Sequence, residues 1–106
     1  MTDCLFCKIA NKTINATIVY EDNEIIAFHD IHPKADIHIL IIPKIHIESM
    51  LHTDNSHVEI IGKIMLKTNE IAKNMGLEAG YKISIHTGIK GGQEVPHLHI
   101  HLLGNK

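Results

Sequence analysis

The sequence predicts an α+β fold, in which one long helix and one or two short helices accompany a mostly antiparallel sheet of about five strands. Three observations lead to this prediction. Short apolar or alternating segments recur along the chain, turn-forming residues separate them, and one longer segment has its apolar residues at helical spacing. A chain of 106 residues has the size of one domain, which we assign to residues 1–106.

The first part of the chain predicts a short helix followed by three strands. Cys4–Ala10 carries a short helical stripe of apolar residues. Ala16–Tyr20 and Glu24–His29 are strand candidates joined by a turn-forming Glu-Asp-Asn stretch, so they predict a hairpin. Ile37–Ile42 is apolar on both faces except at His38, which is typical of a central strand.

The middle of the chain predicts the long helix. His46–Leu51 is expected to form a short helical turn before it. An N-cap at Thr53, Asp54 or Asn55 and a stop at Gly76 delimit the helix. The apolar residues at helical spacing are Val58, Ile61, Ile64, Met65, Ile71, Ala72 and Met75.

The last part of the chain predicts two strands on either side of a glycine-rich loop. Tyr81–His86 alternates as a strand, and residues 87–92 form the loop. Glycines let successive backbone amides approach an anion closely, so we expect an anion-binding site in this loop. The final strand is predicted to start at Pro96, because proline lacks an amide donor and suits the first position of a strand.

Histidines alternate with aliphatic residues in this final strand. His97, His99 and His101 are therefore expected on one face, with the aliphatic residues on the other. Residues two apart on a strand are separated by about 6.6 Å, so the three rings would line a patch as long as a di- or triphosphate. Surface histidines or a metal patch are the alternatives. His38 is either a buried core residue or, if its strand neighbours the final one, a fourth member of the cluster.

Composition excludes several classes of function. The net charge is -2 and there is no basic block, so nucleic acid is not an expected partner. No segment approaches 18 consecutive apolar residues, and Met1–Cys4 lacks the features of a secretory signal. We therefore expect no membrane partner and a cytoplasmic location. In that reducing compartment Cys4 and Cys7 are expected to be thiols.

Several sequence blocks occur together and in a fixed order around the histidines. They are Phe28-His29-Asp30-Ile31, His38, Ile42-Pro43-Lys44, Gly92-Gln93, the three alternating histidines and Leu102-Leu103-Gly104. With these blocks the chain resembles the histidine triad (HIT) superfamily from about residue 5 to residue 104, and within it the Hint-type purine nucleoside phosphoramidases. The resemblance implies the HIT fold, a homodimer and no cofactor for catalysis.

The resemblance also implies roles for individual residues. His99 corresponds to the nucleophile that attacks the α-phosphorus, His101 and His97 to its flanking catalytic partners, and His38 to a supporting histidine. Asp30 corresponds to the carboxylate that accepts hydrogen bonds from the ribose hydroxyls. The apolar wall around the base corresponds to Leu5, Phe6, Ile9, Phe28 and Ile31. The segment that lines the phosphate site corresponds to Gln93, Glu94 and Val95.

Two features set the chain apart within this resemblance. Relatives usually carry Asn, Gln or Ala at the nucleotide-binding position of His86, so its contact with phosphate or ribose is expected to differ. Cys4, Cys7, His46 and His97 correspond to a set that some branches use to bind zinc, and Cys2His2 sets are typical of structural zinc sites. The alternative for the cysteines is a pair of small apolar thiols in a short helix.

The resemblance predicts an enzyme that binds a purine nucleotide through its AMP or GMP moiety. It would hydrolyse purine nucleoside 5'-phosphoramidates, or adenylates with similarly good leaving groups, through a nucleotidylated His99. The rival within the superfamily is dinucleoside polyphosphate hydrolysis. A catalytically weak nucleotide-binding interaction module is a hypothesis of a different class, and His86 favours it. A third hypothesis is a metal protein in which the three alternating histidines hold a catalytic ion.

Overall fold

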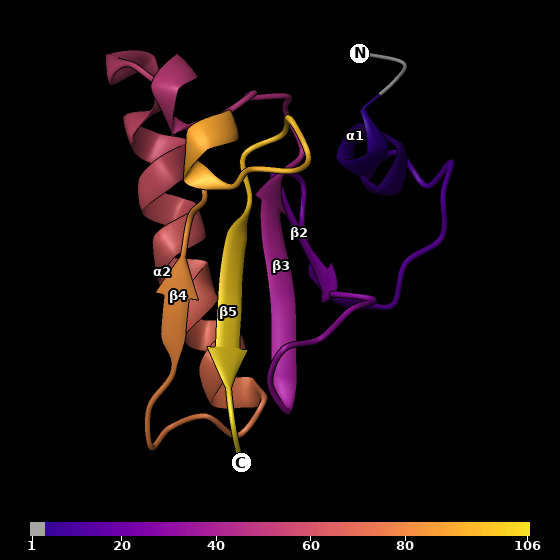
Figure 1. The fold of residues 1–106 in the computed structure, drawn as a ribbon, viewed down its shortest axis with the longest axis vertical. Helices are drawn as coiled ribbons and strands as arrows, with labels where there is room; N and C mark the ends of the chain where they lie inside the picture. Colours follow the sequence, from indigo (N-terminus) through magenta and orange to yellow (C-terminus); the bar gives the residue numbers. More distant parts are fainter. Residues whose placement is uncertain (1–3) are drawn as a thin grey trace.

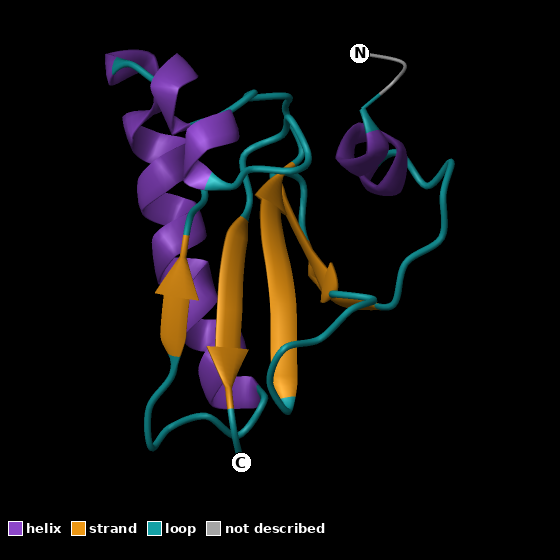
Figure 2. Ribbon diagram, viewed as in Figure 1, coloured by secondary structure: helices purple, strands orange, loops and turns teal. Residues whose placement is uncertain are grey.

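A single antiparallel sheet of five strands forms the centre of the computed structural model, which describes residues 4–106 (Figures 1 and 2). Residues 1–3, on which the argument about a secretory signal partly rests, lie outside the described part. The strand order is β1-β2-β3-β5-β4. The strands are β1 (Ile18–Glu21), β2 (Ile25–His29), β3 (Ile37–Pro43), β4 (Lys82–Ser84) and β5 (Ile100–Gly104). The predicted α+β fold is confirmed.

The two faces of the sheet carry separate apolar layers, because successive side chains of a strand point to opposite faces. One layer lies under the long helix α2 (Val58–Asn74) and includes Ile39, Ile41, Ile100 and Leu102. The other layer packs against α1 (Leu5–Ala10) and includes Ile26, Phe28, Leu40 and Ile42. Figure 1 shows the two helices well apart, so the face that carries α1 is not covered by α2.

The helices begin and end at residues that cap them. Cys4 is the N-cap of α1, and its sulfur accepts a hydrogen bond from the Cys7 N–H at 3.3 Å. Asp54 caps a 3₁₀ turn (Asn55–His57) that runs directly into α2, so the predicted N-cap serves this turn rather than the helix itself. Gly76, with a φ of 84°, follows the helix end as predicted. Within residues 4–106, every helix falls short of the length and apolar character that crossing a bilayer requires.

Two predicted elements are shorter in the structure. The helical turn expected over His46–Leu51 is a 3₁₀ turn at Met50–His52, which starts where the Ser49 hydroxyl accepts the Leu51 N–H. The strand expected over Tyr81–His86 pairs only over the three residues of β4. β4 is an edge strand, so its ends lack a second neighbour that would extend the ladder.

The final strand starts later than its sequence predicts. Pairing begins at Ile100, four residues after Pro96. The N–H of Leu98 donates instead to the carbonyl of Ile47 at 2.6 Å, and Ile47 belongs to a loop. The backbone around His97 is therefore held by a loop contact and not by strand pairing, which changes the direction of its side chain.

Two glycines provide a matched test of how closely β5 packs against Leu77. A Cβ at Gly104 would lie 2.7 Å from both Cδ atoms of Leu77, which is only 2 % exposed. We expect Gly104→Ala to lower the free energy of unfolding by about 1–3 kcal/mol. A Cβ at Gly62, inside α2, would have no neighbour within 4 Å. Because alanine favours a helix more than glycine does, Gly62→Ala should raise the free energy of unfolding by about 0.5–1 kcal/mol. Urea denaturation measures both, and equal effects would contradict the described packing.

Candidate active site

Side chains from neighbouring strands form a grid on the face of the sheet that α2 does not cover. The register aligns one row across the strands, formed by Phe28, Leu40, His101 and Ser84. The adjacent row is formed by His38, Leu103 and Lys82. His99 lies just before β5 and lines the same cleft as His101. Antiparallel pairing of β3 with β5 thus brings His38 beside the alternating histidines.

A cleft of about 920 Å³ lies over this grid. Its volume is within the range of small-molecule and cofactor sites. The predicted site residues that line it are Leu5, Phe6, Ile9, Phe28, Asp30, Ile31, His38, His86, Glu94, Val95, His99 and His101. Two residues predicted to be catalytic or nucleotide-binding, Gln93 and His97, are not part of its lining.

His99 has an unprotonated ring nitrogen. Its Nδ1 lies 2.7 Å from the carbonyl oxygen of His97, and because a carbonyl only accepts, Nδ1 carries the proton. In a neutral imidazole Nε2 then has a free lone pair. Burial lowers the pKa of His99, which the hydrogen bond to His97 only partly opposes, so the neutral ring is favoured near neutral pH. The arrangement gives the cleft a ring nitrogen with a free lone pair.

His101 is held in the opposite tautomer. The backbone N–H of Lys34 donates to His38 Nδ1 at 3.1 Å, so the proton of neutral His38 is on Nε2. His38 Nε2 lies 3.0 Å from His101 Nδ1, which therefore accepts, and 3.4 Å from Asp30 Oδ2. The proton of His101 is consequently on Nε2, a buried atom without a hydrogen-bond partner among residues 4–106. This N–H is a donor that no described residue satisfies, on a ring that lines the cleft.

Burial keeps this pair of rings neutral as well. Burial, together with smaller contributions from the nearby rings of His99, His86 and His38, lowers the pKa of His101 to about 4. Burial also lowers the pKa of His38, although the Asp30 carboxylate opposes this effect. Desolvation disfavours a charged imidazole, so the proton positions deduced above apply near neutral pH.

The end of the cleft next to α1 combines apolar surface with a fixed carboxylate. Phe6 packs edge-on against Phe28 and His99, with ring centroids 5.5 Å and 5.0 Å away. Asp30 follows β2, and its Oδ1 accepts the N–H of His32 at 2.8 Å. This end therefore offers a wall for a flat apolar ring and an acceptor for hydroxyl groups.

The ring of His97 points away from the cleft, so the prediction that three rings line one patch is wrong. The ring is fully buried, and its Nε2 donates to the Pro43 carbonyl at 2.8 Å. Its Nδ1 lies 3.2 Å from the Cys4 sulfur and 3.5 Å from the Cys7 sulfur. Strand pairing begins only at Ile100, which leaves this residue free to turn. His97 contributes its carbonyl to the cleft residue His99 and its ring to a second group.

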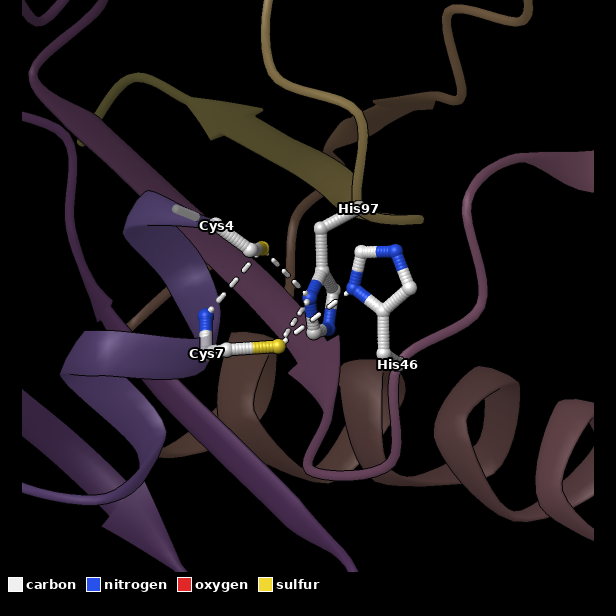
Figure 3. A group of neighbouring side chains, drawn as sticks. All are labelled: Cys4, Cys7, His46 and His97. Carbon is white, nitrogen blue, oxygen red and sulfur yellow. Dashed lines mark hydrogen bonds between the residues drawn. The ribbon is translucent and has the colours of Figure 1, made fainter. Parts of the chain in front are cut away.

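This second group, which we call the Cys/His cluster, consists of Cys4, Cys7, His46 and His97 (Figure 3). Its ligand atoms lie within 4.8 Å of one another, with S–N contacts of 3.2, 3.3 and 3.5 Å. A tetrahedral zinc ion would need S–N edges of about 3.4–3.8 Å. Because Pro43 holds the proton of His97 on Nε2, the lone pair on Nδ1 faces the sulfurs, as a ligand requires.

The two cysteines need a cation nearby to be thiolates, the form that binds a metal. Burial raises the pKa of Cys7 to about 11, and the neighbouring Cys4 contributes to this shift. A divalent cation favours thiolates over thiols, because it compensates the two negative charges in a poorly solvated place. The Cys/His cluster thus fits zinc in its donor set, its spacing and the His97 tautomer.

A catalytic ion held by the cleft histidines does not fit in the same way. Asp30, His38 and His101 have ligand atoms within 4.8 Å of one another. However, His38 Nδ1 accepts the Lys34 N–H, so a metal on Nε2 would leave the ring without any proton. The three alternating histidines do not converge either, since His97 faces the cysteines. The hypothesis of a triad-bound catalytic ion does not match this geometry.

The glycine-rich loop lacks the row of available amides that the sequence predicts. The N–H groups of residues 91–93 donate to carbonyls of the same loop, because it forms a 3₁₀ turn. The Gln93 side chain accepts the Gly88 N–H and donates to the carbonyls of Glu48 and Val95. Gln93 therefore braces the loop and does not line the cleft.

The cleft includes residues that the sequence did not single out. They include Ile14, Asn15, Ala16, Thr17, His29, His32, Lys34, Leu40, Lys82, Ser84 and Leu103. The alternation of Tyr81–His86 already placed Lys82, Ser84 and His86 on one face. Only the pairing of β4 with β5 shows that this face is the one with His101.

The chain is similar to known proteins over nearly its whole length. A family model for the HIT domain matches residues 11–106. Protein HitA of Neisseria gonorrhoeae is 54% identical over 104 residues, covering 98% of this chain and 97% of HitA. The 14 kDa zinc-binding protein of Zea mays is 43% identical over 104 residues, covering 96% of this chain and 81% of the maize protein. The crystal structure of a HIT family hydrolase from Legionella pneumophila Philadelphia 1 has a TM-score of 0.95 at 46% identity, covering 96% of this chain and 92% of that one. With its histidines arranged as described, the chain belongs to the HIT family.

Proposed function

We propose that the protein hydrolyses purine nucleoside 5'-phosphoramidates, or adenylates with similarly good leaving groups, at the α-phosphate. The observation that carries this proposal is the pair of opposite tautomers, with a lone pair on His99 Nε2 and a proton on His101 Nε2. Displacement at phosphorus needs both an attacking atom and a donor for the oxygen charge, and two neighbouring rings here supply one each. The Legionella neighbour is named a hydrolase, which supports the reaction class.

The proposed reaction has two displacement steps. First, His99 Nε2 forms a bond to the α-phosphorus, and the leaving group departs with the electron pair of its own bond and takes up a proton. Water then attacks the same phosphorus and gives up a proton, which replaces the one taken by the leaving group. The bond to His99 breaks, its electron pair returns to Nε2, and a nucleoside monophosphate is released. The nucleotidylated ring is cationic while Nδ1 keeps its proton, so the hydrogen bond to the His97 carbonyl stabilises the intermediate.

The other end of the cleft is proposed to orient the nucleoside. Asp30, held by the His32 N–H, is placed to accept hydrogen bonds from ribose hydroxyls. Phe6 and Phe28 offer apolar surface to the purine. Phe6 also packs edge-on against the ring of His99 and so helps to hold that ring in place. Binding the nucleoside here would bring the α-phosphate to β5.

Two other hypotheses use the same cleft. Dinucleoside polyphosphate hydrolysis would employ the same nucleophile, and two lysines in the cleft, Lys34 and Lys82, favour it. A weakly catalytic nucleotide-binding module is favoured by His86, whose ring stacks on His101 with centroids 4.5 Å apart and takes up space near the phosphate position. The products formed from two substrates separate these hypotheses.

Release of AMP from adenosine 5'-phosphoramidate tests the proposal. We expect wild-type protein to turn over this substrate faster than diadenosine polyphosphates, and His99→Ala to lose at least about a thousandfold in kcat because the nucleophile is absent. Chromatography of the products gives the rates. His52→Ala, at an exposed histidine outside the cleft, is the matched control and should keep the wild-type rate. Nucleotide binding without AMP release would support the interaction module. Faster cleavage of diadenosine polyphosphates than of the phosphoramidate would support the rival hydrolase.

We further propose that the Cys/His cluster binds one structural zinc ion per chain. The donor set, the S–N spacing and the His97 tautomer support this, and the maize relative is named a zinc-binding protein. With zinc bound, Cys4 and Cys7 would fix α1 to the loop of His46 and to His97. The ion would then have no role in the displacement steps, because the cluster does not line the cleft.

Elemental analysis of protein purified without a chelator tests the zinc proposal. We expect about one zinc per chain in wild type and less than about one tenth of that in Cys7→Ser, because losing one thiolate of four ligands weakens the site strongly. His52→Ala should retain the wild-type zinc content. Absence of stoichiometric metal from wild type, also after refolding with added zinc, would show that the cysteines are free thiols.

We also propose that the protein acts as a cytoplasmic homodimer, as the family resemblance implies. Large apolar side chains are exposed in the single chain, among them Leu51, Leu66 and Ile89. A second chain would shield part of this surface from water.

A further inference from the structure

The cleft continues past His101 to the edge of the sheet. The β4–β5 register places Ser84 directly across from His101, and Lys82 directly across from Leu103. These side chains line the same cleft as the proposed nucleophile, and Lys34 joins them from the connection between β2 and β3. We call Lys34, Lys82, Ser84 and Leu103 the β4 subsite.

The β4 subsite carries positive charge, from Lys82 at the edge of the sheet and from Lys34 beside His38, whose Nδ1 accepts the Lys34 N–H. Lys34 and Lys82 are exposed, and within residues 4–106 neither one forms an ion pair, unlike Lys12, Lys44, Lys63 and Lys67. Asp30 lies at the end of β2, three strand positions from Lys82, which is about 14 Å. The cleft therefore has a carboxylate near one end and an unpaired lysine at the other.

The position of the β4 subsite relative to the nucleophile suits a leaving group. The proposed nucleoside wall lies on α1 and β2, and the phosphorus must lie near His99 and His101 on β5. Neighbouring strands are about 4.8 Å apart, so a group bonded to the phosphorus on the side away from the nucleoside would lie over β4. With the nucleoside on one side, the leaving group extends over the other side, across Ser84 and towards Lys82.

We propose that the β4 subsite selects a leaving group that bears an anionic group, either a carboxylate or a phosphate, close to the scissile bond. This inference rests on the proposed function and names the substrate class within it. A lysine ammonium pairs with either anion, and the Ser84 hydroxyl can donate to an anionic oxygen. A neutral alkyl leaving group makes neither contact, so it loses this part of the binding energy.

Three adenosine 5'-phosphoramidates that differ only in their amine test the inference. Butylamine is neutral beyond the nitrogen, 4-aminobutyrate carries a carboxylate, and 3-aminopropyl phosphate carries a phosphate. We expect kcat/KM of at least one charged compound to exceed that of the butylamine compound by about fivefold, which is the upper end of what an exposed ion pair contributes to a free energy of binding. The preference should shrink as the salt concentration rises. The two charged compounds show which anion the subsite prefers.

Charge-removing variants locate the effect. Lys34→Met and Lys82→Met keep the length of the side chain, and we expect each to lower the charged-to-neutral ratio of kcat/KM by about three- to fivefold. Lys73→Met, at an exposed lysine of α2 outside the cleft, should leave this ratio unchanged.

Two results would overturn the inference while the proposed function stands. One is equal kcat/KM for all three compounds in wild type, and the other is a preference that neither lysine variant changes. If no compound releases AMP, the proposed function fails and the inference fails with it.

Discussion

The hydrogen bond from His99 Nδ1–H to the His97 carbonyl is the contact on which the chemistry of the cleft depends. It fixes the tautomer of His99 and leaves the lone pair on Nε2, the atom that we propose to be reactive. The ring of His97 belongs to the Cys/His cluster, which ties α1 to the rest of the protein. α1 in turn carries Phe6, which packs on His99. One residue therefore connects the proposed zinc site, the wall of the cleft and the proposed nucleophile.

The proton of His101 is set in a comparable way, starting from a backbone amide. The Lys34 N–H can only donate, so His38 Nδ1 accepts and the proton of neutral His38 is on Nε2. His38 Nε2 donates to His101 Nδ1, which leaves the proton of His101 on its own Nε2. Because burial lowers the pKa of these rings, the pattern does not depend on a charged imidazole. His101 on β5 and His99, two residues before it, thus carry an N–H donor and a lone pair, respectively. A phosphoryl group that loses one bond while it gains another needs this combination.

The fold was predictable because its signals are local or periodic, whereas the site depends on contacts between distant segments. Alternation in the last strand predicted correctly that Ile100 and Leu102 face the core. The late start of that strand was not predictable, because it follows from a loop contact between Leu98 and Ile47. For the same reason the sequence placed the His97 ring on the wrong surface. Lys82 carries no motif, and only the β4–β5 register reveals its place in the cleft.

Mass spectrometry of the intact protein, quenched shortly after mixing with adenosine 5'-phosphoramidate, tests the central claim most directly. The claim is that the lone pair on His99 Nε2 attacks phosphorus and that the product is a covalent intermediate. We expect wild type to gain the mass of one AMP less one water, with fragmentation placing it on His99, and His99→Ala to gain none. An adduct on another residue, or AMP release without an adduct at any mixing time, would contradict this account.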